Sequence, residues 1–521
     1  MNRRIEQVVV VGADAPAWMA AAALQQSVSA AGIRVRVIEL PTLLQPADVY
    51  SALPELAGFH HRIGLDESLL FSLCKTVPMA GQRFSNWSGA GPPFIQGYDR
   101  PPPVAAGLAF TQLWIKGRQK GLRTDFENFS LAAMAAKAGR VPVPTQDVEL
   151  RSTFGYNIDA AAYSALLRNF VTRGGVETKM AGIAELELDG DRIAAVLLAD
   201  GERVEADLFV DASGPQAALI SRLPGTELDS WREWLPCDRM LVASAKALKP
   251  LPAFGQISAF RQGWVGLFPL QDRTAVVAAY DSRQISDQDV VDSLPALANV
   301  PISGDAVVSS LTQGIRKRTW VGNCVAVGES AFSLEPLDAV QLHITHYCIS
   351  QFMTLFPVDA SAFREAELYD RIIRRAAVNL RDFQFAHYKL NRRFDTPLWD
   401  GCRELAPPET LQRKLDLFAA RGRIPLYDDE TFQEQAWESL FIGHGLMPQS
   451  YDPRVDAVPE QEHIAQVQAR LNDIVGQVEG MAPVDEFIAG VNSEQLQRLK
   501  PLDEDVRHLP TRTMTENMGA D

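Results

Sequence analysis

The chain has 521 residues, 46% of them hydrophobic and 22% charged, a balance that is typical of a globular protein with a large buried core. Its formal net charge of −15 argues against nucleic acid or an anionic membrane surface as a partner. The five cysteines form no C-x-x-C pair, and no segment has the roughly 18 uncharged apolar residues that cross a bilayer, so we expect a cytoplasmic protein without a metal site.

The chain begins with a predicted strand–helix–strand unit over residues 5–40, in which an apolar run is followed by an alanine-rich helix and a second apolar strand. A stretch rich in glycine and proline predicts a loop over 89–103, and alanine and leucine at helical spacing predict a helix over 156–175. The pattern beyond this point predicts strands joined by Asp-Gly turns over 182–214, an antiparallel sheet over 240–285, a strand, turn and long helix over 324–356, helices from about 360 to 499, and a polar tail from Asp503.

The turn after the first strand has the spacing of a dinucleotide-binding loop, whose pattern G-x-G-x-x-G appears at residues 12–17 as Gly-Ala-Asp-Ala-Pro-Ala. Gly12 allows the tight turn, and Glu39 ends the second strand where such folds keep the acid that binds ribose. Asp14 replaces the glycine that lets the backbone approach a pyrophosphate. Two like charges at ~4 Å repel by about 4 kcal/mol at an effective dielectric of ~20. Pro16 removes one N–H donor from the helix start.

A second interpretation of the same residues is an ordinary helix start. Asp14 would then cap the helix through its side chain, with Pro16 in the first turn. The sequence leaves both interpretations open.

Two further short segments accompany this loop in an order known from flavoproteins. They are DASG at residues 211–214 and VGE at residues 327–329, and with the loop they resemble the FAD-binding scaffold of flavoprotein monooxygenases. The resemblance implies that FAD is bound by Gly12, Ala13, Ala15, Ala17, Glu39, Asp211, Gly214, Gly328, Glu329 and Leu337.

Longer matches make the resemblance more specific, because the chain is similar to the flavin-dependent tryptophan halogenase family over roughly residues 5–500. The matching segments are QRFSNW (82–87), LPCDR (235–239), VGNCVAVG (321–328) followed by SLEPLDAV (333–340), RDFQFAHYKLNRRFDTPLW (381–399) and GHGLMPQSYDP (443–453). The resemblance implies an α/β fold: an FAD-binding, three-layer Rossmann-like module over 1–350, with an antiparallel substrate-side sheet inserted at about 101–150 and 216–300. A mostly helical C-terminal region over 351–502 and a flexible tail over 503–521 complete the predicted domains.

The resemblance also implies a chemistry. In the family, reduced flavin reacts with oxygen, halide captures the hydroperoxide, and the hypohalous acid travels to a lysine beside the substrate. The position of that lysine is Met79 here, and the family's catalytic glutamate is Asp338. A thioether cannot act as the amine does, and it reacts with oxidants itself. An ordinary helix cap is the alternative role for Asp338.

The chain also differs from the family motifs at other positions. The family's Ser-Thr-Gly after the glutamate is Ala339-Val340-Gln341, and the second Trp of its W-x-W-x-I-P motif is Gly266. Lys75 lies four residues before Met79, a distance of about 13 Å along an extended strand.

These departures favour an FAD-dependent oxidoreductase or monooxygenase that acts on an aromatic or other small substrate rather than on halide. One alternative is a cofactor-poor binding or scaffolding protein of the same fold. Another is a true halogenase in which Lys75 replaces the missing lysine. For the flavoenzyme, the resemblance further implies a separate flavin reductase, and it also implies a homodimer. The net charge and the lack of a long apolar segment predict no nucleic acid or membrane partner.

Overall fold

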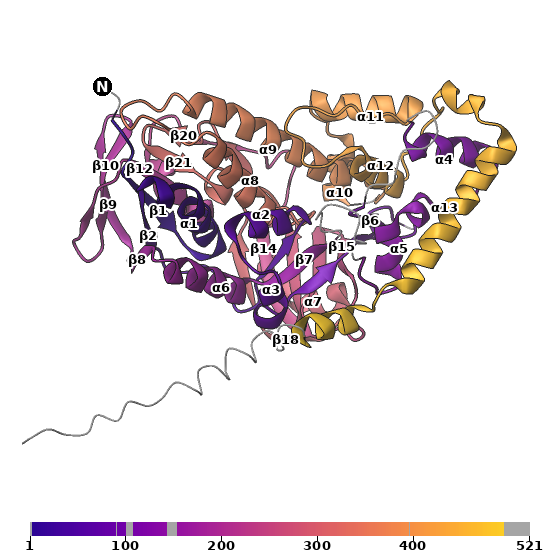
Figure 1. Cartoon of the computed structure of the whole chain (residues 1–521). Helices are drawn as coiled ribbons and strands as arrows, with labels where there is room; N and C mark the ends of the chain where they lie inside the picture. The colour runs from indigo at the N-terminus through magenta and orange to yellow at the C-terminus, as the bar shows by residue number, and fades with distance from the viewer. Residues whose placement is uncertain (1–2, 90, 100–107, 143–153, 395, 494–521) are drawn as a thin grey trace, which may run out of the picture.

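The N-terminal strand lies in the middle of a six-stranded sheet, at one end of the molecule in Figure 1. The computed structural model describes residues 3–89, 91–99, 108–142, 154–394 and 396–493. In spatial order the strands of this sheet are β20 (Trp320–Val321), β21 (Cys324–Ala326), β12 (Leu208–Ala212), β1 (Gln7–Gly12), β2 (Arg34–Glu39) and β8 (Glu177–Met180).

The four central strands of this sheet, β21, β12, β1 and β2, run parallel. Val8 to Val11 of β1 are fully buried, as expected for a parallel strand that is covered on both faces. Helix α1 (Asp14–Val28) packs its alanines against α6 (Ala160–Arg173) and α8 (Gln341–Thr354), because small side chains allow close approach. The predicted strand–helix–strand unit over 5–40 is confirmed.

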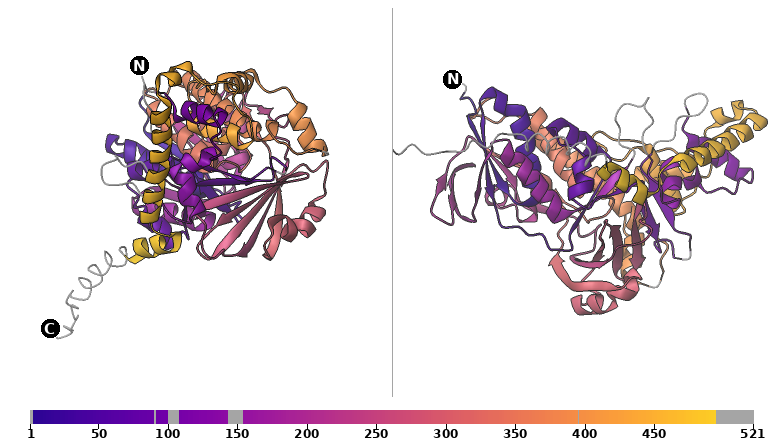
Figure 2. Two further views of the ribbon diagram at one scale, coloured as in Figure 1. Left: turned by 90° about the vertical axis from the view of Figure 1, so that its right-hand side faces the viewer. Right: turned by 60° about the horizontal axis from the view of Figure 1, so that its bottom comes forward.

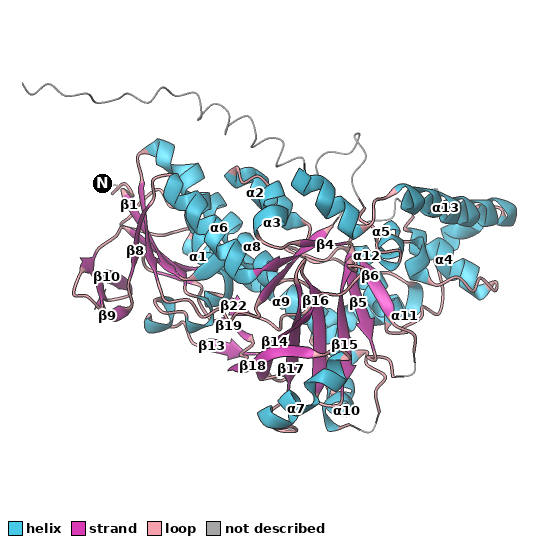
Figure 3. Cartoon of the chain, turned by 90° about the horizontal axis from the view of Figure 1, so that it is seen from below, coloured by secondary structure: helices cyan, strands magenta, loops and turns pink. Residues whose placement is uncertain are grey.

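A second, seven-stranded sheet projects from the middle of the molecule, as Figures 2 and 3 show. Only β5 and β15 pair in parallel in it. Its order is β18 (Ile302–Ser310), β14 (Arg239–Lys246), β17 (Arg273–Tyr280), β16 (Gly263–Pro269), β15 (Phe254–Phe260), β5 (Gly81–Ser85) and β6 (Phe94–Gly97). Helix α7 (Asp287–Ala298) covers one face with Val290 and Leu294. The antiparallel sheet predicted over 240–285 is therefore present.

Three small sheets join these parts. Their strands are β9 (Ile183–Asp189), β10 (Arg192–Leu198) and β11 (Arg203–Val204); β13 (Leu228–Ser230), β19 (Gly314–Arg316) and β22 (Phe332–Ser333); and β3 (Val49–Ala52), β7 (Gly155–Asp159) and β4 (Val77–Met79). The strands predicted over 182–214 are confirmed, although the last of them, β12, belongs to the six-stranded sheet.

Two boundaries differ from the sequence prediction. The described part of 101–150, residues 108–142, adds no strand to the large sheet; it forms α4 (Phe110–Gln119) and α5 (Leu131–Lys137). The extra strands are β5 and β6, and β6 lies inside the stretch predicted as loop (89–103). Tertiary pairing outweighed local composition there, since Phe94 to Gln96 are buried between the sheet and helices.

The C-terminal third is helical, as predicted for the residues that the structure describes. Its helices are α9 (Ala366–Lys389), α10 (Pro397–Glu404), α11 (Glu409–Arg421), α12 (Glu434–Gly443) and α13 (Glu460–Gly480). Helix α9 runs back along the body of the molecule, and α13 lies along its far end (Figure 1). The tail predicted from Asp503 lies outside the described residues. Among the described helices, none is both long and apolar enough to cross a membrane.

Candidate active site

The carboxyl ends of four parallel strands meet at one edge of the six-stranded sheet. Gly12 ends β1 and lies level with Ala212 of β12 on one side and Glu39 of β2 on the other. A Cβ on Gly12 would lie 2.2 Å from the Ala212 carbonyl oxygen, so strand packing requires glycine here. This edge is where ligands bind in open α/β sheets.

Asp14 occupies the second glycine position of the loop with a φ of +59°, a left-handed conformation that glycine adopts at no cost. Its carboxylate accepts a hydrogen bond from Thr42 Oγ1 at 2.7 Å and one from the Leu43 N–H at 3.4 Å. The interpretation of Asp14 as a helix cap is wrong, because Ala13 is the N-cap residue and no side chain caps the helix. Asp14 instead ties the loop to the segment after β2.

Three other predicted cofactor contacts differ in their surroundings. Gly214 has a φ of +68° and faces open space. Glu39 accepts a hydrogen bond from the Arg168 guanidinium, with Oε2 3.0 Å from Nε. Asp211, in contrast, is fully engaged inside the protein. Its oxygens accept hydrogen bonds from the backbone N–H groups of Ser213, Leu219 and Ile220 and from the Ser213 and Ser330 hydroxyls. Asp211 therefore shapes the turn rather than facing a ligand.

The segment after β21 forms a second turn at this edge of the sheet. Gly328 has a φ of +63°, and a Cβ there would lie 2.8 Å from Thr345 Oγ1 on α8. Glu329 is half-buried, accepts a hydrogen bond from Ser333 Oγ at 3.2 Å, and has a pKa raised by burial. A cavity of about 730 Å³ opens at the same edge between Leu40–Pro41, β9 and residues 216–222. Among the described residues, its lining carries one cation, Arg222, and one anion, Glu185, and includes none of the predicted FAD contacts. The fit to an anionic dinucleotide such as FAD rests instead on the open space at Gly214, at the carboxyl edge of the sheet.

Asp338 lies beyond this edge, in a turn that leads into α8. Asp338 and Ala339 both have left-handed backbones, with φ of +60° and +59°. Gln384 of α9 holds the turn by donating from Nε2 to the carbonyl oxygens of Glu335 and Leu337, both at 3.1 Å. The alternative of a helix cap is wrong, because α8 begins at Gln341 with Val340 as its N-cap.

The Asp338 side chain starts a buried chain of polar groups. Asp338 Oδ1 lies 3.1 Å from His387 Nε2, and His387 Nδ1 lies 2.9 Å from His444 Nε2. All three side chains are buried, and Phe84 stacks on the His387 ring at 4.3 Å between centroids. Asp338 Oδ2 and His444 Nδ1, the two ends of the chain, have no hydrogen-bond partner among the described residues. Neither His387 nor His444 was predicted from the sequence as a site residue.

Glu335 forms a separate buried cluster. Its Oε2 accepts hydrogen bonds from Trp264 Nε1 at 2.7 Å and from the Tyr388 hydroxyl at 2.6 Å. Burial raises the Glu335 pKa to about 7, although the two hydrogen bonds stabilise the carboxylate and act to lower the pKa. Trp264, the first Trp of the W-x-W-x-I-P match, thus donates a hydrogen bond to Glu335, which was not predicted as a site residue.

Met79 is fully buried at the end of β4, opposite Gly155 of β7. The next residue, Ala80, accepts the backbone hydrogen bond of Tyr98. Lys75, by contrast, is half exposed and lies 3.9 Å from Asp272. The Lys75 side chain pairs with Asp272 at the surface and does not lie along β4. The fold therefore gives no support to the hypothesis that Lys75 replaces the missing lysine.

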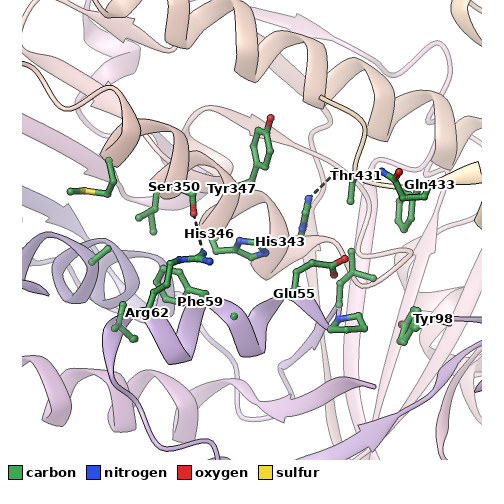
Figure 4. Close-up of a pocket in the computed structure, with 18 of the residues that line it drawn as sticks. Glu55, Phe59, Arg62, Tyr98, His343, His346, Tyr347, Ser350, Thr431 and Gln433 are labelled. Carbon is green, nitrogen blue, oxygen red and sulfur yellow. Dashed lines mark hydrogen bonds between the residues drawn. The ribbon is translucent and has the colours of Figure 1, made fainter. Parts of the chain in front are cut away.

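A larger cavity of about 1260 Å³ lies between α2 (Glu55–Ile63) and α8 and reaches Tyr98. Figure 4 shows Tyr98, Thr431 and Gln433 at one end of it and Arg62 with Ser350 at the other. The negative charge of Asp338 acts on the Tyr98 hydroxyl and, with burial as the main cause, raises the pKa of that group beyond its usual range. Asp338 itself is not among the described residues that line this cavity.

The motifs that carried the resemblance could have pointed to part of this site. His387 and Tyr388 are the His-Tyr of the segment 381–399, and His444 lies in the segment 443–453. Nothing in the sequence indicates that these two segments meet, since they belong to α9 and the end of α12.

Known proteins share the sequence pattern and the fold of this chain. A family model described as tryptophan halogenase matches residues 7–460. The tryptophan 6-halogenase ThaL of Streptomyces albogriseolus is 24% identical over 91% of this chain and 95% of its own. The structure of BrvH, a flavin-dependent halogenase from Brevundimonas sp. BAL3, superposes with a TM-score of 0.88 at 30% identity, covering 94% of this chain and 99% of that one.

A flavin-dependent halogenase from Xanthomonas campestris also superposes with a TM-score of 0.88, at 26% identity and with the same coverage. The fold predicted from the resemblance is therefore confirmed, and these matches support neither the predicted loss of halogenation nor a non-catalytic role. Because the family model covers most of the chain, this protein belongs to the tryptophan halogenase family.

Proposed function

We propose that this protein is an FAD-dependent oxidoreductase that oxidises an aromatic or other small substrate at the inner end of the α2–α8 cavity. FAD would lie at the carboxyl edge of the six-stranded sheet, held by Gly12, Ala13, Ala15, Ala17, Glu39, Gly214, Gly328, Glu329 and Leu337. Bound in reduced form from a separate reductase, it supplies the electrons and activates O₂. In a monooxygenation, one oxygen atom goes to the substrate and the other leaves as water.

The observation that carries the proposal is the free oxygen of Asp338. Asp338 Oδ2 is buried and has no hydrogen-bond partner in the described part of the chain, while Oδ1 is held by His387. A carboxyl group with one oxygen fixed and the other without a partner is suited to take or give a proton at a reacting group. The lysine position, in contrast, is a buried thioether, so no amine is present there to relay hypohalous acid.

The two histidines fix the proton positions around Asp338. The carboxylate can only accept, so His387 donates from Nε2; in the neutral ring Nδ1 is then an acceptor, and His444 donates from its Nε2. Burial and the nearby His387 and Arg392 lower the His444 pKa well below its usual range, which keeps that ring neutral. Because His387 Nε2 already carries a proton and Nδ1 already accepts from His444, a proton that arrives at Asp338 stays on the carboxyl group, and His387 holds that group in position.

The test is a turnover assay of the full chain with a flavin reductase, NADH, O₂ and a panel of indoles and phenols, with and without bromide. We expect products that gain oxygen or lose hydrogen, and a bromide-independent yield. A brominated product from the wild-type chain would contradict the proposed loss of halogen transfer. Absence of all flavin-dependent turnover would contradict the proposal as a whole.

Met79→Lys is the matched variant, with Met79→Leu as its control. If the missing amine is what prevents halogen transfer, only the lysine variant forms a brominated product.

A further inference from the structure

The α2–α8 cavity has several buried polar atoms on its wall without a hydrogen-bond partner in the described part of the chain. They are Gln96 Oε1, Tyr98 Oη, His343 Nδ1, His346 Nε2 and Gln435 Oε1. A buried polar atom that forms no hydrogen bond costs about 1–3 kcal/mol, and native proteins keep few of them. Their concentration on one cavity indicates that a polar ligand, rather than an apolar one, completes their hydrogen bonds.

Two of these residues, His343 and His346, lie side by side on α8 in the middle of the cavity (Figure 4). Their rings are 4.8 Å apart in an edge-on arrangement, and His343 Nε2 is bonded to Thr431 Oγ1 at 2.8 Å. Burial lowers the His343 pKa to about 4 and holds the His346 pKa well below its usual range, so both rings are neutral. A neutral ring nitrogen can accept a hydrogen bond or donate one, which suits the amide or hydroxyl groups of a ligand.

Two charged residues of α2, on the wall of the cavity opposite α8, lie toward its two ends. Glu55 and Arg62 lie seven residues apart on α2, which separates them by about 10 Å along the helix axis. Arg62 is the only arginine or lysine among the described residues that line the cavity, and it reaches Ser350 Oγ at 3.4 Å. Glu55 acts electrostatically on Tyr98, at the same end as Asp338. About 10 Å is the length of three extended residues.

The cavity volume agrees with a long ligand. At about 1260 Å³ it exceeds the roughly 300–1,000 Å³ of pockets that enclose drug-sized molecules. A single aromatic amino acid placed with its ring at Tyr98 would leave the half near Arg62 empty.

We infer that the substrate of this protein is an elongated aromatic acid, about as long as a tripeptide. Its ring lies at Tyr98, its polar middle contacts His343 and His346, and its carboxylate pairs with Arg62. The assignment of the reacting end rests on the function proposed above, whereas the binding itself does not.

Calorimetric titration of the full chain with Trp-Gly-Gly, with its C-terminal amide and with tryptophan tests this inference. We expect the peptide acid to bind about tenfold more tightly than its amide and more tightly than tryptophan. Arg62→Gln should remove the preference for the acid over the amide. Arg371→Gln, an exposed arginine of α9 outside the cavity, should keep it.

His346→Phe separates ligand binding from stability. The free protein should be as stable as the wild type or more stable, because a buried unpartnered nitrogen is removed, while both peptides bind about tenfold more weakly. Equal affinity of acid and amide for the wild-type chain, a preference that survives Arg62→Gln, or no binding of either peptide would overturn the inference. Expected binding without flavin-dependent turnover would instead overturn only the proposed function.

Discussion

Asp14 and Thr42 form a 2.7 Å hydrogen bond that joins the loop after β1 to the segment after β2. The same carboxylate lies in the loop where the family fold receives a pyrophosphate, on a residue with left-handed backbone geometry. A single side chain thus determines both the charge of the loop and the position of the neighbouring segment.

Replacement of Asp14 by glycine should tighten FAD binding. The substitution removes a negative charge beside the phosphates and the conformational cost of a side chain at positive φ, and we expect a gain of about tenfold or more in affinity. Quenching of flavin fluorescence during titration measures it. Asp14→Asn, which keeps the side-chain size, should show most of the gain. Unchanged affinity in both variants would mean that the carboxylate, held by Thr42, is directed away from the phosphates.

Substitution in the Asp338–His387–His444 chain should affect turnover in a graded way. Asp338→Asn should lower kcat about 100-fold, because the group that moves the proton is lost. His387→Gln keeps a donor to Asp338 and should retain much more activity than His387→Phe, with KM little changed in both. His444→Gln should shift the pH profile of kcat. Equal loss in the Gln and Phe variants of His387, with the profile unmoved, would indicate a packing role only.

Glu335 should make the protein less stable as the pH rises. Its pKa is about 7 in the folded chain against an ordinary 4.5, so the folded state binds more protons between these values. The contribution of Glu335 to the free energy of unfolding is largest below about pH 4.5. It falls as the pH rises to about 7 and stays constant above that pH, and the total difference is about 3 kcal/mol.

Thermal unfolding between about pH 5 and pH 8 measures this effect. Glu335→Gln, which mimics the protonated group, should match the wild type at the acid end and exceed it at the alkaline end. Glu404→Gln, at an exposed position, is the control. Parallel curves for the wild type and Glu335→Gln would refute the assignment.

The buried ion pair of Lys414 and Glu430 should stabilise the wall of the large cavity. The Lys414 ammonium lies over the rings of Tyr427 and Trp437, and both charged side chains are almost fully buried. Lys414→Met should cost about 3–5 kcal/mol, because Glu430 is left as an unpaired buried charge. The double variant Lys414→Met/Glu430→Gln should recover most of it.

Chemical denaturation measures the free energy of unfolding of the Lys414 and Glu430 variants. Arg413→Gln, which breaks the exposed pair with Glu409, should change stability by less than about 0.5 kcal/mol. A double variant as unstable as Lys414→Met alone would contradict the explanation.

The local patterns of the sequence were sufficient for the elements whose neighbours are close in the chain. The apolar run of β1, the alanines of α1 and the second strand ending at Glu39 follow from periodicity and turn chemistry, and the family motifs supplied the fold. The strand β6 and the helices over 108–142 were not predicted, because their state depends on burial against distant segments and not on local composition.

Local patterns and the family motifs were enough to predict a dinucleotide-type fold with an aspartate in its loop, a methionine aligned with the family's lysine and an aspartate aligned with the family's glutamate. The contacts of these residues follow from the packing of the folded chain. Asp14 bonds Thr42 rather than capping its helix, and Asp338 bonds His387 rather than capping α8. The reason is physical: hydrogen-bond partners of buried groups come from segments far apart in the chain, and only the packing of α8, α9 and the end of α12 brings Asp338, His387 and His444 together.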